Sequence, residues 1–244
     1  LCNDIVAVAQ LSPSQLDVIH VSRPVLRLAR EIFQLPDNRS SLVWYHSIFV
    51  YYLEALELLV EVSSPSCKFI SEIVERWREQ TSDDFRFCFK FPATISHNAA
   101  LRNCDDLTHE FFTRMSPLAN RIGQYWLQLP ATFGPRDLPA LWQFLDALPH
   151  GFTYGVEVRH PEFFAKGDAE KALNRGLHER SVNRVILDSR PVHSAIAHND
   201  AIIDAQRKKP KVPVHAVVTA SNPMVRFIGS DNMQQNQEMF AVWL

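Results

Sequence analysis

Apolar residues in the later two thirds of the chain follow two spacings, one typical of strands and one typical of helices. Short apolar or alternating runs predict strands at residues 85–91, 125–129, 154–158, 184–188, 214–218 and 225–228. Apolar positions three and four apart predict helices at residues 71–80, 107–118, 138–148 and 169–180. The repeated order of strand, helix and strand predicts parallel βαβ units.

The first 70 residues carry signals that conflict. Residues 25–33 have helical spacing, residues 35–39 read as a turn, and residues 53–62 fit a helix that runs into a strand. We therefore divide the chain into residues 1–70, expected to be part of the same barrel, and a regular domain at residues 71–244.

Two architectures compete for this pattern, a closed (β/α)₈ barrel and an open doubly wound sheet. The run RVILD at residues 184–188 is largely apolar on both faces, as expected for a strand that helices cover on both sides. Neither GxGxxG nor GxxxxGK[ST] follows a predicted strand, which counts against a nucleotide-binding open sheet. We predict an α/β, TIM-barrel-like (β/α) barrel. Because the chain starts at Leu1 and ends on an apolar run, we expect one or both ends to be incomplete.

Composition narrows the function classes. The chain has 244 residues and a net charge of −2, so it lacks the basic field that a general nucleic-acid or membrane-surface role needs. No uncharged apolar run is long enough to predict a membrane helix. Four cysteines without CxxC spacing indicate a reduced, cytoplasmic setting. We expect a small-molecule partner, no nucleic acid and no membrane. The sequence indicates no particular cofactor or oligomeric state.

Polar residues gather where the predicted strands end, which is where barrels and open α/β sheets bind ligands. Seven of them fall at four successive strand ends: Lys90, Gln128, Glu157, Arg159, His160, Asp188 and Arg190. His97 lies in the loop after the first strand, and Arg226 lies within a later strand that ends at residues 229–231. Period-two alternation puts Glu157 and Arg159 on one face of their strand. A nearby arginine favours the ionised carboxylate, so we interpret Glu157 as an ionised anchor rather than a general acid.

These residues predict an enzyme that acts on a small polar or anionic ligand bearing phosphate or carboxylate. We assign the role of base or charge partner to Glu157 or Asp188, and proton transfer to His160 or His97. The predicted ligand-binding residues are Lys90, Gln128, Arg159, Arg190 and Arg226.

Other interpretations of the same residues stay open. Glu157 and Arg159 could form a structural ion pair, His160 and His97 could cap turns, and Asp188 could cap the next helix. The protein would then be a non-catalytic binding or scaffold protein. A divalent-metal hydrolase or isomerase is a third possibility. Its ligands would come from Glu157, His160, Asp188, His193 and His215. Because no HExxH spacing occurs, we predict no metal.

Four segments resemble blocks of the YecE-like family, also catalogued as domain of unknown function seventy-two. Residues 83–97 resemble its "dF.F..K....iTH" block, residues 122–130 its "lG..l.QLP" block, residues 156–164 its "vE.RH..wf" block and residues 225–229 its "yvRfhG" block. Order and spacing agree across residues 72–244. The resemblance implies a TIM-barrel-like fold and a bacterial cytoplasmic protein, and it implies no particular reaction.

The chain departs from the family pattern outside these blocks. Family members open with an "IG.sgW" strand and a "VE.N.tfY" block, whereas Val60 and Glu61 are followed here by VSSPSC. Residues 1–70 do not resemble the family, and the chain stops before its usual final strand and helix. Site residues that the family carries on those strands therefore have no counterpart in the matching blocks.

Overall fold

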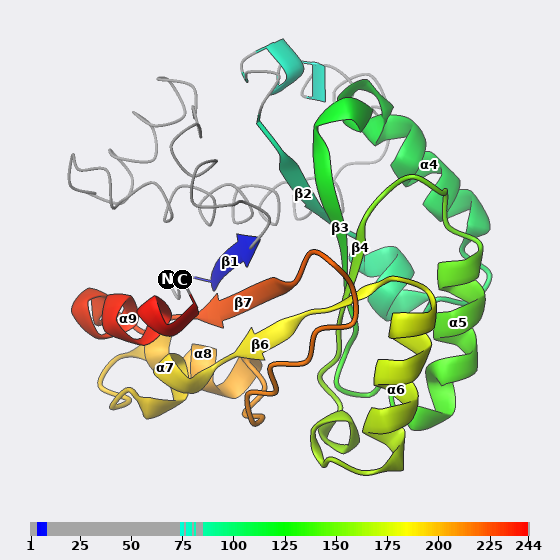
Figure 1. The fold of residues 1–244 in the computed structure, drawn as a ribbon. Helices are drawn as coiled ribbons and strands as arrows, with labels where there is room; N and C mark the ends of the chain where they lie inside the picture. Colours follow the sequence, from blue (N-terminus) through cyan, green and yellow to red (C-terminus); the bar gives the residue numbers. More distant parts are fainter. Residues whose placement is uncertain (1–3, 9–73, 76, 80, 82–84, 244) are drawn as a thin grey trace. The chain divides into compact units, whose positions relative to one another are not determined.

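The computed structural model describes residues 4–8, 74–75, 77–79, 81 and 85–243 (Figure 1). These residues form a mixed α/β fold with parallel strands and helices, in two compact units. One unit holds the described parts of residues 1–10, 127–149 and 153–244, and the other holds those of residues 11–126 and 150–152. The elements predicted for residues 25–62 lie outside the described residues. Of the helix predicted for residues 71–80, residues 74–75 and 77–79 are helical.

In the second unit, β2 (Phe87–Lys90) lies parallel to β3 (Ile122–Gln128). A π-helical turn (Thr94–Asn98), α4 (Asp105–Met115) and the 3₁₀ helix η4 (Ser116–Arg121) connect the two strands. Proline lacks the N–H that an α-helix interior needs, and Pro117 follows the last residue of α4 by two positions. The helix predicted for residues 107–118 is therefore present, but its last residues are 3₁₀-helical.

Aromatic side chains form the core of this unit. Alternation along the segment FRFCFKF buries its phenylalanines, and the Phe87 and Phe89 rings stack with centroids 5.6 Å apart. Tyr125 of β3 meets Phe91 at 6.0 Å and Phe112 of α4 at 4.8 Å. The alternation that predicted a strand at residues 85–91 therefore also selects the side chains that pack between strand and helix.

The first unit contains the end of β3 and then η5 (Pro135–Asp137), α5 (Leu138–Asp146), β4 (Tyr154–Glu157), η6 (Pro161–Phe164), α6 (Asp168–Glu179) and β5 (Asn183–Arg184). β4 and β5 are parallel, with Gly155 opposite Asn183. The unit β4–α6–β5 is thus a βαβ unit of the predicted kind.

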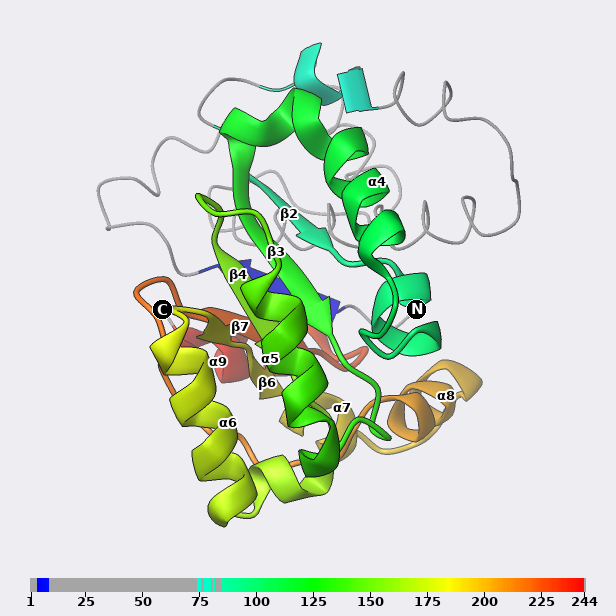
Figure 2. The ribbon, with the colours of Figure 1, turned by 90° about the vertical axis from the view of Figure 1, so that its right-hand side faces the viewer.

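α5 and α6 lie side by side (Figure 2). A Cβ at Gly176 of α6 would be 2.5 Å from the Trp142 indole of α5, so glycine allows this close approach. Arg180 lies 4.8 Å from the centre of the Trp142 ring and donates to both Asp146 oxygens, at 2.7 and 2.9 Å. The Arg180 hydrogen bond lowers the pKa of Asp146. A cation–π contact and an ion pair therefore join the two helices.

The predicted strand at residues 184–188 is split between two sheets. Its first part, β5, pairs with β4, and its second part, β6 (Ile186–Asp188), pairs in parallel with β7 (Met224–Ile228). Between them the Val185 amide still donates to Val156 O at 2.9 Å. β1 (Asp4–Val8) lies antiparallel on the other side of β7, so this sheet has the order β1-β7-β6.

Helices α7 (Arg190–Ser194), α8 (Asp200–Lys208) and α9 (Met233–Phe240), with η7 (Ala241–Trp243), complete the first unit (Figure 1). Leu187 of β6, Val192 of α7, Ala205 of α8 and Ile228 of β7 form one buried cluster. The apolar end of β6 is thus anchored directly before its terminal residue, Asp188.

The strand predicted for residues 214–218 is wrong, because this segment pairs with no described strand and Val218 is 62% exposed. The Thr219 hydroxyl accepts from the Arg184 amide at 2.7 Å and donates to Val182 O at 2.6 Å. The Thr219 hydroxyl is therefore hydrogen-bonded to the Arg184 amide and the Val182 carbonyl, two backbone groups that a strand next to β5 could have bonded. Pro213, just before the segment, also lacks an N–H for a ladder.

The strands of the described residues form no closed sheet, so closure of the predicted barrel stays a prediction. In the same part of the chain, no helix is both long and apolar enough to cross a membrane.

Candidate functional site

The ends of β3 and β4 bring four of the predicted site residues of the first unit together. Gln128 ends β3 and Glu157 ends β4, and the Leu129 amide donates to Glu157 O at 2.9 Å. Arg159 follows two residues after Glu157, and Arg226 lies in the middle of β7. We call Gln128, Glu157, Arg159 and Arg226 the strand-end cluster.

Glu157 is the centre of this cluster and is fully buried. Arg226 Nη1 donates to its Oε1 at 2.9 Å and to its Oε2 at 3.1 Å, and Arg159 Nε donates to Oε1 at 2.9 Å. The shared face predicted for Glu157 and Arg159 is therefore confirmed. Because guanidinium N–H groups point at both oxygens, a carboxyl proton would find no acceptor here, and the arrangement fits an ionised Glu157.

Arg226 also reaches the neighbouring strand. Its Nη1 donates to Gln128 Oε1 at 3.2 Å, and its side chain is only 1% exposed. Three elements, β3, β4 and β7, are thus tied by one guanidinium. Hydrogen bonds between a buried arginine and fixed acceptors make a rigid charged network of this kind.

Arg159 differs from Arg226 in how far solvent reaches its side chain. Its side chain is 14% exposed, and its hydrogen bond to Glu157 uses Nε alone. Among the described residues, its two terminal amino groups donate to no acceptor. The cluster therefore presents an arginine whose plane is fixed and whose two outer nitrogens remain available.

Asp188 and Arg190, at the end of β6, are two residues apart like Glu157 and Arg159, but here the arginine contacts both carboxylate oxygens. Arg190 Nε and its backbone amide donate to Asp188 Oδ1 at 2.9 and 3.1 Å, and Arg190 Nη2 donates to Oδ2 at 2.6 Å. The indole of Trp243 donates to Oδ2 at 3.0 Å. The hydrogen bond from Arg190 to Asp188 raises the pKa of that arginine. The N-cap position of α7 is Ser189, so the interpretation of Asp188 as the N-cap of the next helix is wrong. Both oxygens of Asp188 are occupied.

Lys90 and His97 lie in the other unit, among neighbours of their own. Lys90 Nζ is 5.9 Å from the centre of the Trp126 ring. His97 Nδ1 is 2.8 Å from Ser96 Oγ, and the same hydroxyl donates to Pro92 O at 3.1 Å. The roles proposed for Lys90 and His97 stay predictions.

His160 caps the 3₁₀ helix η6. Its Nδ1 accepts from the Glu162 amide at 3.3 Å, so in the neutral ring the proton sits on Nε2. The ring packs against Phe163 at 6.0 Å, and a Cβ at Gly134 would come within 3.1 Å of its Nε2. This is the capping arrangement considered for His160, and its proposed part in proton transfer stays a prediction.

Four of the five candidate metal ligands have other partners, and the fifth, His193, has a buried Nε2 without a hydrogen-bond partner among the described residues. Glu157 and Asp188 accept from arginines, His160 accepts from an amide, and His215 Nδ1 lies 2.7 Å from Glu170 Oε1. Within the described part of the chain, no group of three or more His, Cys, Asp or Glu side chains could hold a metal ion.

Sequence reasoning missed a second buried ionic network in the first unit. Glu170 Oε1 accepts from Arg184 Nη1 at 2.9 Å and pairs with His215 Nδ1, while its Oε2 accepts from the Lys166 amide at 2.7 Å. Burial lowers the pKa of Arg184. Burial would raise the pKa of Glu170, but hydrogen bonds from His215, Lys166 and Arg184 lower it overall. The partners are up to 45 residues apart, so no local pattern predicts the network.

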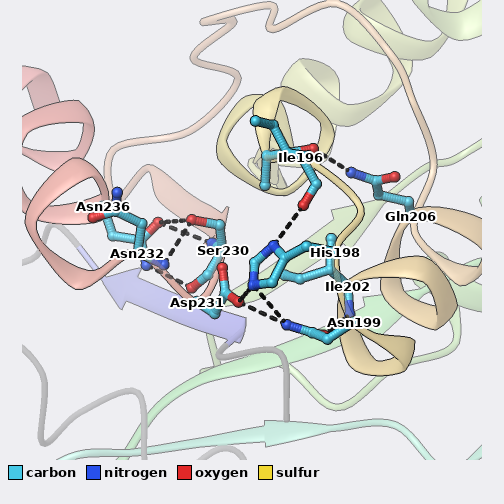
Figure 3. A network of polar contacts seen from close by, with 10 residues as sticks. Ile196, His198, Asn199, Ile202, Gln206, Ser230, Asp231, Asn232 and Asn236 are labelled. Atoms are coloured by element: carbon cyan, nitrogen blue, oxygen red, sulfur yellow. Dashed lines mark hydrogen bonds and ion pairs between the residues drawn. The ribbon is translucent and has the colours of Figure 1, made fainter.

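A third network joins the segments that follow α7 and β7 (Figure 3). Asp231 Oδ2 lies 3.1 Å from His198 Nε2 and accepts from Asn199 Nδ2 at 2.9 Å. Asn199 also caps α8, because its Oδ1 accepts from the Ile202 amide at 2.9 Å. His198 Nδ1 is 2.9 Å from Ile196 O, so both ring nitrogens are engaged. The network fixes the start of α8 against the segment after β7.

The same segment is anchored to α9. Asn236 donates to Ser230 O at 2.8 Å and accepts from the Ser230 amide at 2.9 Å (Figure 3). A Cβ at Gly229 would lie 2.8 Å from Asn236 Nδ2, so a side chain at that position would displace the amide. Local sequence pattern does not predict this anchor, because Asn236 lies six residues after Ser230.

A family model and two curated relatives show the family of this chain. It belongs to the family described as "Protein of unknown function DUF72", whose model matches residues 69–244, and this confirms the resemblance seen in its sequence blocks. The UPF0759 protein YecE of Escherichia coli strain K12 is 79% identical over 173 residues, which is 71% of this chain and 64% of that protein. YecE of Escherichia coli O157:H7 is 78% identical over the same shares. The chain thus spans less than two thirds of these curated relatives.

Solved structures of the same family are more distant. The DUF72 family protein EF0366 of Enterococcus faecalis V583 is 20% identical, with a TM-score of 0.46 over 62% of this chain and 56% of that chain. The DUF72 family protein TM1631 of Thermotoga maritima MSB8 is 19% identical, with a TM-score of 0.43 over 65% and 53% of the two chains.

Proposed function

We propose that the strand-end cluster binds a small ligand through a carboxylate or phosphate group, with Arg159 as the group that contacts it. One observation carries this proposal. Arg159 is held by Glu157 through Nε alone, and its two terminal amino groups donate to no described residue.

The chemistry of arginine supports an oxyanion as the bound group. Its planar guanidinium presents paired N–H donors that match the two oxygens of a carboxylate or phosphate. The contact with Glu157 fixes the plane of this group before any ligand arrives, which lowers the entropy lost on binding. Exposure of 14% for Arg159, against 1% for Arg226, makes Arg159 the cluster arginine that solvent reaches more readily.

In this proposal Glu157 is a charge partner that orients the arginines. Both of its oxygens accept guanidinium N–H groups, so a role as general base would require it to leave these partners. Arg226 and Gln128 hold the carboxylate in place from the neighbouring strands. Arg190 uses Nε and Nη2, one edge of its guanidinium, on Asp188, and its side chain is 49% exposed. Its greater exposure to water makes it a weaker candidate for ligand contact than Arg159.

The location of the cluster is consistent with the barrel that we proposed from sequence. Ligands of (β/α) barrels bind at the C-terminal ends of the strands, and Gln128 and Glu157 are the last residues of β3 and β4. Barrel closure and a cytoplasmic location remain part of the proposal. Their support is the βαβ pattern and the absence of disulfide or membrane signals in the sequence.

A non-catalytic binding protein is the second candidate. The observation that favours it is the pairing of both strand-end carboxylates with arginine, Glu157 with Arg159 and Arg226, and Asp188 with Arg190. Such pairing suits a site that fixes an anion and leaves no carboxylate poised as a base.

Thermal unfolding with added anions tests the proposal. Wild-type protein should show a saturable rise in midpoint temperature with sodium acetate or sodium phosphate, relative to sodium chloride at equal ionic strength. Arg159→Gln should abolish the rise. Arg175→Gln removes the same charge from an exposed position of α6 and should keep it. A saturable rise of equal size in Arg159→Gln, or none in the wild type, would contradict the proposal.

A further inference from the structure

Gln128 ends β3 with a side chain that is 94% buried, since only 6% of the residue is exposed. The atom that faces Arg226 Nη1 at 3.2 Å must be the amide oxygen, because a guanidinium nitrogen can only donate. The amino group, Nε2, therefore points elsewhere. Among the described residues it has no acceptor.

The Gln128 amino group is not among the buried side-chain atoms that lack a partner, so solvent reaches it and it can donate to a ligand. This amino group belongs to the same cluster as the outer nitrogens of Arg159. One chain of hydrogen bonds runs from Gln128 through Arg226 and Glu157 to Arg159. Neighbouring strand ends carry the two residues, and the Leu129 amide joins these ends by its bond to Glu157 O.

The polarity of the cluster is one-sided. The acceptor atoms, Gln128 Oε1 and both Glu157 oxygens, already take guanidinium N–H groups. The groups left over, Gln128 Nε2 and the two Arg159 amino groups, are all donors. A ligand group that carries its own N–H or O–H would meet only donors here.

We infer that Gln128 Nε2 contacts the same ligand group as Arg159, and that the two residues together select an ionised carboxylate or phosphate over an uncharged amide. This inference rests on the proposed function and adds a specificity-determining residue to it. The class of ligand is a metabolite with a terminal ionised carboxylate or phosphate, which has at least two oxygens free to accept hydrogen bonds. Its oxygens would accept hydrogen bonds from Gln128 Nε2 and from the two terminal amino groups of Arg159.

Gln128→Glu reverses the polarity at this one position. The substituted side chain still offers an oxygen to Arg226, so the contact that holds β3 and β7 is kept. Its second oxygen replaces the amino group and repels an anion. Binding of acetate and of inorganic phosphate should fall about tenfold or more, because like charges at one site cost at least that much affinity.

Titration of acetate, inorganic phosphate and acetamide into the full-length chain tests the inference. Acetate or phosphate should bind the wild type, and acetamide should not bind at concentrations at which they saturate. Gln143→Glu adds the same charge to an exposed position of α5 and should keep anion binding. The inference is overturned if Gln128→Glu binds anions as the wild type does, or if acetamide binds as well as acetate.

Two outcomes separate this inference from the proposed function. A wild type that binds neither anion removes both. Anion binding that is lost in Arg159→Gln but kept in Gln128→Glu removes only the inference. If Gln128→Glu does not fold, the comparison of acetate with acetamide on wild-type protein still tests the predicted selectivity for a charged group. The side-chain amino signals of Gln128 in a proton–nitrogen NMR spectrum give the same decision, because they must move on addition of acetate.

Discussion

Substituting Glu157 by glutamine changes one oxygen of the strand-end cluster into an amino group and removes the charge. Glu157 is 0% exposed and accepts three guanidinium contacts of 2.9, 2.9 and 3.1 Å. In the variant, the new amino group would face an arginine N–H, and both are donors. Arg226, at 1% exposure, would lose the carboxylate that compensates its charge.

The expected loss is large for a change of one atom. Removing one partner of a buried ion pair typically costs about 3–5 kcal/mol, because the other charge stays buried. An exposed pair is worth about 0–1 kcal/mol. Asp146→Asn is the matched control, since it makes the same carboxylate-to-amide change in a pair whose Asp146 side chain is 57% exposed.

Urea unfolding at pH 7, followed by tryptophan fluorescence, measures both variants. Glu157→Gln should lower the free energy of unfolding by about 3–5 kcal/mol, and Asp146→Asn by about 1 kcal/mol or less. Adding Arg226→Met to Glu157→Gln removes the buried charge as well. This double variant should recover stability relative to Glu157→Gln alone.

A loss of about 1 kcal/mol or less for Glu157→Gln would refute the reasoning, because it would mean that the buried carboxylate does not compensate Arg226. A double variant less stable than both single variants would also contradict it. Either result would imply that the cluster holds its arginines by packing rather than by charge.

Three further predictions concern residues outside the cluster. Gly176→Ala should lower the free energy of unfolding in urea by about 1–3 kcal/mol, because its Cβ would lie 2.5 Å from the Trp142 indole. An unchanged unfolding midpoint would show that α5 and α6 can move apart at no cost. Burial raises the pKa of the Cys88 thiol to about 12, so native protein at pH 8 should leave Cys88 unlabelled by iodoacetamide in peptide mass spectra, and labelling as fast as in urea would contradict this. The pKa of Glu170 is lowered in the folded chain, so its stabilisation is present above the ordinary glutamate pKa and is lost as pH falls through the lowered value. In urea unfolding, Glu170→Gln should therefore be less stable than the wild type at pH 7, and the difference in stability should shrink in acid. An equal difference at both pH values would contradict a stabilising role for the ionised Glu170.

Local periodicity predicted the parts of this fold that depend on neighbouring residues. Alternation at residues 85–91 and 156–159 set which side chains share a face, and the bond between Arg159 and Glu157 follows from it. The strand predicted at residues 184–188 is present as two short strands, β5 and β6, because its two parts pair with different distant partners. The apolar run looks the same whether it pairs with β4 alone or with β4 and then β7.

For the candidate site too, the sequence predicted which residues take part but not how they contact one another. Positions in and at the ends of predicted strands selected Gln128, Glu157 and Arg226 as candidates. They did not predict the geometry, in which Arg226 Nη1 donates to both Glu157 oxygens and to the amide oxygen of Gln128. Arg226 is 69 residues from Glu157 and 98 residues from Gln128, so only the folded chain shows that one guanidinium contacts both. The bond from Trp243 to Asp188 was equally beyond local pattern, with 55 residues between them.

The most direct test of the oxyanion site observes the guanidinium itself. Nitrogen-detected NMR of the arginine side chains, during titration with acetate and then with inorganic phosphate, reports which guanidinium meets the anion. The account predicts a saturable change at Arg159 with at least one of the two anions, and no comparable change at Arg190, whose guanidinium is bound to Asp188. An Arg159 signal that stays still with both anions, or that drifts linearly like those of exposed arginines, would contradict it.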